Sequence, residues 1–219
     1  MRIDNRQLFD FGAGVYTWMT LQPTWREHCR DVVRTLAADG HTPPTHVLDL
    51  GVGPGVSAFA VHDVFPGCHC TGVDISGRML QRAGVLAEKE AGSVDLVLAN
   101  AEELPFEDDS FDALLAHSFF YLLPDSPKVF REAARVLRSG ARLALLEPRD
   151  GGSLSRLLAV NPTRLRFMMS MAGWRVASRN FGRWKGPDLI GALEDAGFSD
   201  LNAEPCLEGM GWLVTGRLG

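Results

Sequence analysis

The chain has 219 residues, of which 46% are hydrophobic and 22% are charged, and its formal net charge is −5. This balance excludes a wholly disordered chain, and the negative charge gives no overall attraction for nucleic acid or an anionic membrane. The length exceeds the usual domain size of about 100–200 residues, yet a three-layer α/β domain often reaches it. We therefore expect a single domain over residues 1–219.

The chain shows no sign of secretion, membrane insertion or metal binding. It opens without the apolar stretch of a signal peptide, and no apolar run approaches the ~20 residues that cross a bilayer. The four cysteines do not suggest a disulfide framework, because a core of this size needs no cross-links. Cys68-His69-Cys70 lacks further ligands at a recognisable spacing. We expect a cytoplasmic protein with no integral membrane contact and no bound metal.

Short apolar runs alternate with longer amphipathic segments, a pattern typical of βαβ units and a mostly parallel sheet. The apolar spacing predicts helices over residues 23–39, 56–65, 76–90, 127–138 and 187–196. Strands are predicted over residues 46–50, 71–74, 95–99, 112–116, 142–147, 200–204 and 211–217. Gly140 and Gly197 are placed to end the last two helices. Residues 149–186 fit no repeat of the pattern and indicate an inserted cap.

A glycine-rich segment, Asp49-Leu50-Gly51-Val52-Gly53-Pro54-Gly55, leaves the first predicted strand and enters a helix. Glycines there allow a tight turn and close approach to a ligand, beside the free N–H groups of a helix N-terminus. Asp74 ends the next strand, where a carboxylate can accept hydrogen bonds from ribose hydroxyls. The dinucleotide fingerprint requires glycine at position 56, which is Val56. The pattern predicts a nucleoside ligand and argues against a nicotinamide oxidoreductase.

The motifs 47–55, 72–76, 101–106 and 109–112, in this order and spacing, resemble those of class I S-adenosylmethionine-dependent methyltransferases, most closely the ubiquinone/menaquinone-biosynthesis type. The resemblance covers about residues 8–148. It implies a Rossmann-like α/β fold with a seven-stranded, mostly parallel sheet, helices on both faces and an antiparallel C-terminal strand. The implied cofactor is S-adenosyl-L-methionine.

The resemblance also assigns roles to individual residues. The loop glycines would pass beneath the methionine part of the cofactor, Asp74 would hold the ribose, and the His117 carbonyl would meet the methionine amino group. The family usually has Asp-Ala after strand three, where this chain has Asn100-Ala101, whose amide oxygen can still accept from the adenine amino group. The implied cofactor-binding residues are Gly51, Gly53, Gly55, Asp74, Ile75, Asn100, Ala101, His117 and, as a second candidate near the adenine, Glu102. An N-terminal segment, residues 1–40, would fold over the cofactor through Phe9-Asp10 and Tyr16.

Methyl transfer from a sulfonium needs no protein nucleophile, and alignment alone can supply about 7–11 kcal/mol of the barrier. If the acceptor is a hydroxyl or amine, His117 is a candidate general base because imidazole titrates near neutral pH. Its alternative is to contribute only a carbonyl and ring packing. Tyr16 could orient acceptor or cofactor. Aromatic faces attract a sulfonium, so Tyr16, Trp18, Phe119 and Phe120 are candidates to surround it, with core packing as the alternative.

The predicted cap is basic and apolar. Residues 151–185 carry seven Arg or Lys residues and no acid, interleaved with Met and aromatic side chains. Three interpretations stay open: an adaptable lid whose arginines meet a carboxylate or phosphate on the acceptor, a helix whose arginines face water, and a landing site for RNA or an anionic membrane.

We therefore expect methyl transfer to a small-molecule acceptor that is hydrophobic or aromatic, with an anionic group as an option. No nucleic acid partner is expected, and a homodimer is an option. The alternatives are an RNA or protein methyltransferase and a cofactor-binding protein without turnover. The sequence leaves the acceptor and the methylated atom open.

Overall fold

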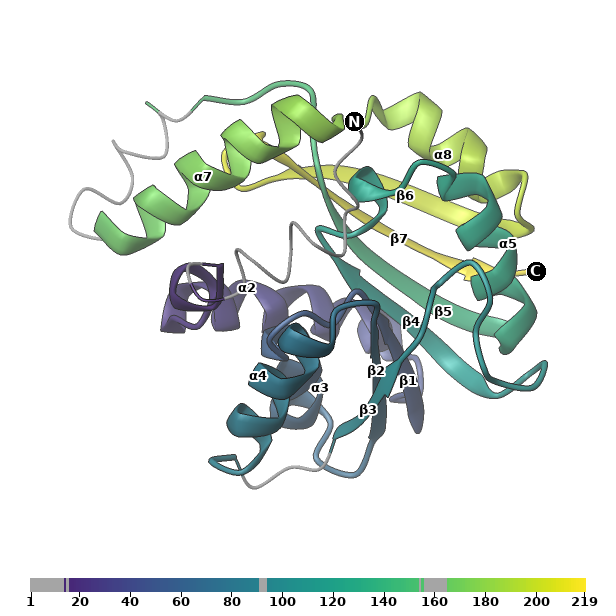
Figure 1. The fold of residues 1–219 in the computed structure, drawn as a ribbon. Helices are drawn as coiled ribbons and strands as arrows, with labels where there is room; N and C mark the ends of the chain where they lie inside the picture. The colour runs from purple at the N-terminus through teal and green to yellow at the C-terminus, as the bar shows by residue number, and fades with distance from the viewer. Residues whose placement is uncertain (1–13, 15, 91–93, 154, 156–164) are drawn as a thin grey trace.

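The computed structural model describes residues 14, 16–90, 94–153, 155 and 165–219. Seven strands form one sheet in the order β3-β2-β1-β4-β5-β7-β6 (Figure 1). The strands are β1 (His46–Leu50), β2 (His69–Asp74), β3 (Val94–Leu98), β4 (Phe111–His117), β5 (Leu137–Pro148), β6 (Phe198–Cys206) and β7 (Gly211–Leu218). The first five pair in parallel, and β7 runs antiparallel to both β5 and β6. This topology confirms the expected fold.

Helices cover both faces of the sheet (Figure 1). The N-terminal helices and α7 pack on one face, and α5 and α8 pack on the other. The helices are α2 (Pro23–Arg34), α3 (Val56–Val64), α4 (Gly77–Ala87), α5 (Ser126–Val136), α7 (Leu165–Phe181) and α8 (Gly186–Glu194), with the short 3-10 helices η1 (Thr35–Gly40) and η2 (Phe120–Leu122).

Strand β1 shows why the sheet needs cover on both sides. Val47 belongs to the core beneath α2 and α3, whereas Leu48 and Leu50 belong to the core beneath α5. All three side chains are buried. A continuous apolar run of this kind is typical of a parallel strand that is buried on both faces. The strand therefore ends in the interior, and its C-terminal edge presents the glycine loop.

Several predicted helices end earlier than expected, among them the one predicted over residues 76–90, which ends at Ala87. The helix predicted over residues 23–39 ends at Arg34 and continues as η1. The helix predicted over residues 127–138 ends at Val136, because Leu137 is buried and pairs with Phe111 as the first residue of β5. Gly140, with φ +79°, lies inside that long strand instead of ending a helix. The helix predicted over residues 187–196 ends earlier, at Glu194 with Asp195 as its cap, and Gly197, with φ +95°, lies in the turn that follows.

The segment predicted as a cap contributes the 17-residue helix α7. Phe167, Met168 and Met171 of α7 are buried in the same core as Trp25 of α2. A parallel bridge between Arg149 and Trp184 joins the two ends of the segment. The segment therefore returns to the end of β5 after crossing the face that carries α2. Its role as a cap stays a prediction.

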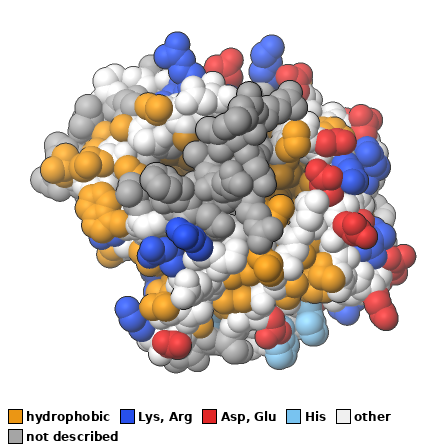
Figure 2. Space-filling model, in the orientation of Figure 1, with side chains coloured by type: hydrophobic (Ala, Val, Ile, Leu, Met, Phe, Trp, Pro, Cys, Tyr) orange, Lys and Arg blue, Asp and Glu red, His pale blue; other side chains and the backbone are white. Residues whose placement is uncertain are grey.

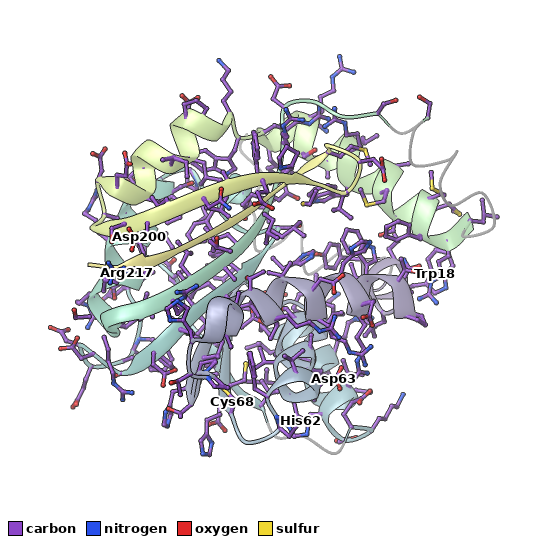
Figure 3. The ribbon with its side chains drawn as sticks, turned by 180° about the vertical axis from the view of Figure 1, so that it is seen from behind. Trp18, His62, Asp63, Cys68, Asp200 and Arg217 are labelled. Carbon is purple, nitrogen blue, oxygen red and sulfur yellow. The ribbon has the colours of Figure 1, made fainter. Side chains whose placement is uncertain are left out.

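The four cysteines are free thiols, as expected. Among the described residues no three His, Cys, Asp or Glu side chains are grouped as a metal site would require. In the view of Figure 3, Cys68 and His62 lie at the lower end of the molecule, apart from Trp18. In the described part of the chain no helix is both long enough and apolar enough to cross a bilayer.

Candidate functional site

The glycine loop between β1 and α3 has a backbone that only glycine adopts easily. Gly51, Gly53 and Gly55 have φ values of +71°, +53° and +93°. A Cβ on Gly51 would lie 2.2 Å from Cδ2 of Phe119, so no side chain fits there without displacing that ring. The Gly51 and Val52 N–H groups donate to the Val73 carbonyl at 2.9 and 3.0 Å. The loop is therefore fixed to the end of β2 as well as to β1.

Asp74, the last residue of β2, connects the loop to the next turn. Its Oδ2 accepts from the Gly53 N–H at 2.9 Å, and its Oδ1 accepts from the Ser76 N–H at 2.8 Å. A carboxylate has about four lone-pair directions, so further donors can still be accepted. The side chain is thus held at the edge of the loop by backbone groups on both sides.

A small cavity of about 90 Å³ opens beside Asp74. It brings together most of the residues predicted to bind the cofactor: Gly51, Gly53, Asp74, Ile75, Asn100 and Ala101. The Asn100 Oδ1 accepts from the Glu102 N–H at 3.1 Å, which fixes the amide and leaves a second lone pair. Glu102 itself is not brought to this cavity, and its carboxylate pairs with Lys128 at 2.9 Å. We call this space the nucleoside cavity.

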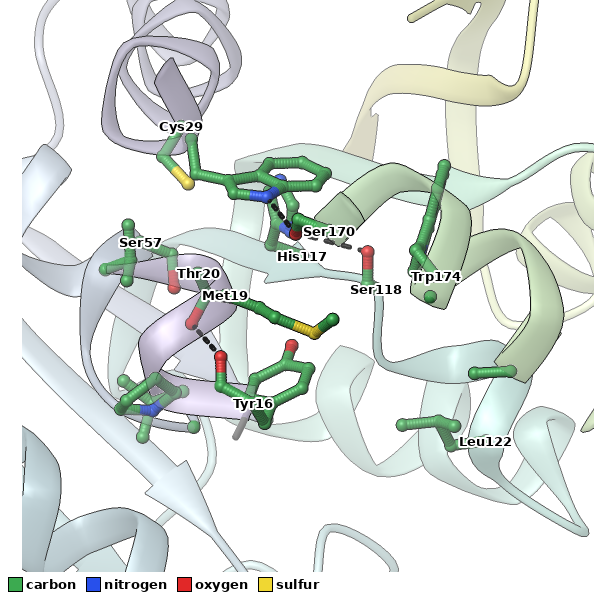
Figure 4. Close-up of a pocket in the computed structure, with 18 of the residues that line it drawn as sticks. Tyr16, Met19, Thr20, Cys29, Ser57, His117, Ser118, Leu122, Ser170 and Trp174 are labelled. Carbon is green, nitrogen blue, oxygen red and sulfur yellow. Dashed lines mark hydrogen bonds between the residues drawn. The ribbon is translucent and has the colours of Figure 1, made fainter. Parts of the chain in front are cut away.

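A larger cavity of about 320 Å³, the apolar chamber, adjoins the nucleoside cavity. Figure 4 shows residues of its wall. The two spaces share five lining residues: Tyr16, Gly51, Gly53, Ser118 and Leu122. The remainder of the chamber is lined by Met19, Thr20, Trp25, Cys29, Val52, Pro54, Val56, Ser57, His117, Tyr121, Ser170, Gly173, Trp174, Ala177 and Phe181. Its walls therefore come from the glycine loop, the end of β4, α2 and α7.

His117 is the last residue of β4 and lines the chamber. Its ring packs edge-on against the Trp25 ring, with 5.4 Å between centroids. Burial, with a smaller contribution from the neighbouring His28, lowers the pKa of His117 to about 4. The imidazole is therefore neutral at pH 7 and much less basic than the near-neutral titration assumed from sequence. This favours a hydrogen-bonding role over complete proton abstraction.

Tyr16 stands where the two cavities join, and its ring comes within 3.8 Å of the position of a Cβ on Gly53. Its carbonyl accepts from the Thr20 hydroxyl at 2.9 Å. Desolvation, reinforced by the nearby Asp74 carboxylate, raises the pKa of Tyr16 above its usual value. The phenol is a neutral hydrogen-bonding group at the junction. Phe9-Asp10, predicted to act beside it, lies outside the described residues.

Two of the four aromatic residues proposed to surround a sulfonium lie elsewhere. Phe120 is fully buried and stacks on Phe130 at 4.2 Å, so it belongs to the core. Trp18 lies outside both cavities, and the Arg166 guanidinium covers its ring at 4.8 Å. Phe120 is unavailable to a sulfonium because the segment after β4 turns its side chain into the core. Trp18 is unavailable because its ring already contacts the Arg166 guanidinium. Tyr16 and Phe119 do line the cavities.

Glu147, near the end of β5, was missed by the sequence analysis. Its carboxylate accepts from the backbone N–H groups of Phe119, Phe120 and Tyr121 at 2.8, 2.9 and 3.0 Å. It therefore shapes the turn after β4 that lines both cavities. An acidic residue at the end of an otherwise apolar buried strand was the available signal, since such a carboxylate must find donors. Burial raises its pKa to about 7 despite these bonds.

Asp49 lies beneath the loop and makes a second buried acid. Its Oδ2 accepts from the Ser57 hydroxyl at 2.6 Å, and Oδ1 has no partner among the described residues. Burial, with the nearby Asp74 charge, raises the pKa of Asp49 to about 7. The carboxyl group thus fixes the first turn of α3 through Ser57, but burial disfavours its charged form.

The raised pKa of Asp49 predicts how stability depends on pH. In the unfolded chain the group titrates near 3.8, so between about pH 4 and pH 7 the folded protein binds the extra proton. Stability from this group is therefore full below pH 4 and is lost as pH rises through 7. We expect Asp49→Asn to be more stable than the wild type at pH 8 by about 2–4 kcal/mol, with a smaller difference at pH 4. Urea unfolding at both pH values measures this, and a destabilised variant at pH 8 would contradict it.

Comparison with known proteins identifies the domain that carries the loop. The family described as "Methyltransferase domain" matches residues 48–145. This stretch of the chain is therefore similar to methyltransferase domains. The match begins in β1, ends in β5 and includes the glycine loop, Asp74, Asn100 and His117.

Individual relatives agree with this assignment. The chain is 42% identical over 108 residues to a ubiquinone/menaquinone biosynthesis C-methyltransferase from Rhizobium etli, covering 48% of this chain and 42% of that protein. It is 28% identical over 165 residues to an arsenite methyltransferase from Halobacterium salinarum, covering 74% and 39%. The chain thus spans about two fifths of the length of these curated relatives.

A solved structure extends the likeness of the fold beyond the matched domain. Phosphoethanolamine N-methyltransferase 2 from Haemonchus contortus, in complex with S-adenosyl-L-methionine, superimposes with a TM-score of 0.70 at 21% identity. The alignment covers 93% of this chain and 46% of that one. The similarity of fold therefore extends over most of the chain, whereas α2 and α7, which wall the chamber, lie outside the residues that the family matches.

Proposed function

We propose that this protein binds S-adenosyl-L-methionine and transfers its methyl group to a small hydrophobic molecule. One observation carries the proposal: the nucleoside cavity beside Asp74 adjoins an apolar chamber, and Gly51, Gly53 and Tyr16 line both. A methyl donor and an apolar acceptor could meet at that junction. The relatives act on chemically different acceptors by name, so they support the reaction class and leave the acceptor open.

The nucleoside cavity offers a partner for each part of the cofactor. Asp74 would accept from the ribose hydroxyls, and Asn100 would accept from the adenine amino group beside Ile75 and Ala101. The glycine loop would lie beneath the methionine part of the cofactor, and the His117 carbonyl would accept a hydrogen bond from the methionine amino group. Bound S-adenosylmethionine supplies an electrophilic methyl group on a sulfonium. The protein's part is to align the acceptor with it and exclude water, which can provide about 7–11 kcal/mol.

His117 and Tyr16 remain our candidates for direct contact with the reacting groups. Both line the chamber, and Tyr16 also lines the nucleoside cavity. With a pKa of about 4, His117 would accept a hydrogen bond from an acceptor without holding its proton at pH 7. Tyr16 would orient the acceptor through its neutral hydroxyl.

Two alternative functions are less well supported. A nicotinamide enzyme would need glycine at position 56, where Val56 starts α3 and lines the chamber. An RNA methyltransferase would need an extended basic surface. Arg175, Arg179 and Arg183 line one outer depression, whereas along the right-hand edge of the face in Figure 2 acidic and basic side chains mix. Only an assay for methylated product distinguishes an enzyme from a protein that binds the cofactor without turnover.

The test is calorimetric titration of the protein with S-adenosylmethionine and, separately, with NADH. We expect micromolar binding of the first and none of the second. Formation of S-adenosylhomocysteine in the presence of a panel of hydrophobic acceptors then tests turnover. Absence of S-adenosylmethionine binding would refute the proposal, and binding without product from any acceptor would favour the cofactor-binding alternative.

A further inference from the structure

The wall of the apolar chamber carries no charged side chain among the described residues. None of the twenty residues that line it is Asp, Glu, Lys or Arg. Its polar groups are hydroxyls, a thiol, an imidazole and two indoles. An ionised ligand placed there would lose water without gaining a counter-ion, which is costly in a desolvated site. The lining therefore penalises charge on whatever occupies the chamber.

The arginines of α7 do not supply the missing counter-ion, although their number in the sequence had suggested an anionic acceptor. Arg166 donates to the carbonyls of Trp18 and Leu21, and Arg175 donates to the Arg149 carbonyl at 2.9 Å. Arg179 lines a separate outer depression together with Arg175 and with Arg183, which follows the helix. The described cations of this helix thus bind backbone carbonyls or face outward, and none reaches the chamber.

The titratable groups of the chamber are held in their uncharged forms. Desolvation raises the pKa of Tyr16, Tyr121 and Cys29 and lowers that of His117 to about 4. At neutral pH the described residues that line the chamber therefore contribute neither an anion nor a cation.

Two phenols are among the hydrogen-bonding groups of the chamber, together with serine and threonine hydroxyls and with His117 Nε2 and Trp174 Nε1, which have no partner among the described residues. Tyr16 and Tyr121 are the only tyrosines of the chain, and both line this space. Tyr121 is held by an edge-on contact with Phe181 of α7, with 6.5 Å between ring centroids. The two phenols are close enough for Tyr16 to raise the pKa of Tyr121. In Figure 4 the Tyr16 hydroxyl lies beside the Met19 side chain, inside the chamber. A phenol hydroxyl both donates and accepts, so either tyrosine can bind a hydroxyl or a carbonyl oxygen.

We propose that the chamber selects an uncharged, ring-bearing acceptor whose hydroxyl or carbonyl oxygen binds the Tyr16 and Tyr121 hydroxyls, and that it discriminates against anionic acceptors. This inference rests on the proposed function and specifies its substrate class. It replaces the anionic option that the basic composition of residues 151–185 suggested.

The test compares two probes that share one ring system. The protein saturated with S-adenosylhomocysteine, which prevents turnover, is titrated at pH 7 with neutral 2-naphthol and with anionic 2-naphthoate. We expect 2-naphthol to bind at least tenfold more tightly. Equal affinity for the two probes would overturn the inference, as would failure of both to bind. If S-adenosylhomocysteine itself does not bind, the proposed function fails instead.

A cation placed in the chamber should reduce the preference for the neutral probe. Met19 lines the chamber, whereas Met169 is exposed on α7 and does not. We expect Met19→Lys to reduce the preference for 2-naphthol by at least tenfold, and the matched control Met169→Lys to leave it unchanged. An unchanged preference in a folded Met19→Lys protein that still binds S-adenosylhomocysteine would contradict an electrostatic cause.

The role of the phenols is tested by an isosteric variant that does not depend on Met19→Lys folding. We expect Tyr121→Phe to weaken 2-naphthol binding about fivefold, the effect of one neutral hydrogen bond. Binding of 2-methylnaphthalene, which has no oxygen, should stay unchanged. A parallel loss for both ligands would indicate a packing role and refute recognition by the hydroxyl.

Discussion

Asp74→Ala is expected to weaken binding of S-adenosylmethionine at least 100-fold. The carboxylate accepts from the Gly53 and Ser76 N–H groups and, in our proposal, from the ribose hydroxyls. A charge-assisted hydrogen bond contributes about 1.5–3 kcal/mol, so loss of two ligand bonds amounts to about 3–6 kcal/mol. Calorimetric titration measures the change directly.

Two further variants separate ligand contact from damage to the loop. Asp74→Asn keeps one acceptor oxygen, so we expect a loss of about tenfold, intermediate between wild type and Asp74→Ala. Asp95→Ala removes an exposed carboxylate of the neighbouring strand β3 and should leave binding unchanged. Near-normal affinity in a folded Asp74→Ala protein would mean that this acid does not hold the ribose.

The sequence predicted the sheet well because burial on two faces leaves a local signal. Val47 and Leu48 point to opposite cores, so β1 reads as a short continuous apolar run. The boundary between α5 and β5 was wrong because a tertiary contact decides it. Leu137 suits a helix as well as a strand in local sequence, and its pairing with Phe111 extends the strand.

The candidate site also has a part that local sequence predicts and a part that tertiary contacts decide. The glycine loop and Asp74 could be found because the ligand-binding geometry depends on a few neighbouring residues at fixed spacing. The chamber could not, because its walls come from segments far apart in sequence. The Trp25 indole donates to the Ser170 hydroxyl at 2.6 Å, across 145 positions of the chain. Nothing local indicated that Phe119 would face the nucleoside cavity while Phe120 turned into the core.

Glu147→Ala is expected to destabilise the fold by about 3–5 kcal/mol, the loss typical of removing one partner from a buried charged network. Three backbone N–H groups, those of Phe119, Phe120 and Tyr121, would lose their acceptor inside the protein. Each unsatisfied buried donor costs about 1–3 kcal/mol, although relaxation of the turn reduces the sum. Chemical unfolding at pH 7 measures the free energy, with Glu204→Ala on β6 as an exposed acidic control.

Glu147→Gln tests whether the charge or the acceptor oxygen matters. The pKa of about 7 means that the carboxyl is about half protonated at neutral pH, so a neutral amide is a close substitute. Its single carbonyl oxygen has two lone pairs for three donors, so we expect a loss of only about 1–2 kcal/mol. Because the turn from Phe119 to Tyr121 lines both cavities, the alanine variant should also bind S-adenosylmethionine more weakly. If Glu147→Ala unfolded like the wild type and kept its affinity, the three hydrogen bonds would not be what fixes this turn, and its shape would have to come from the packing of Phe120 on Phe130.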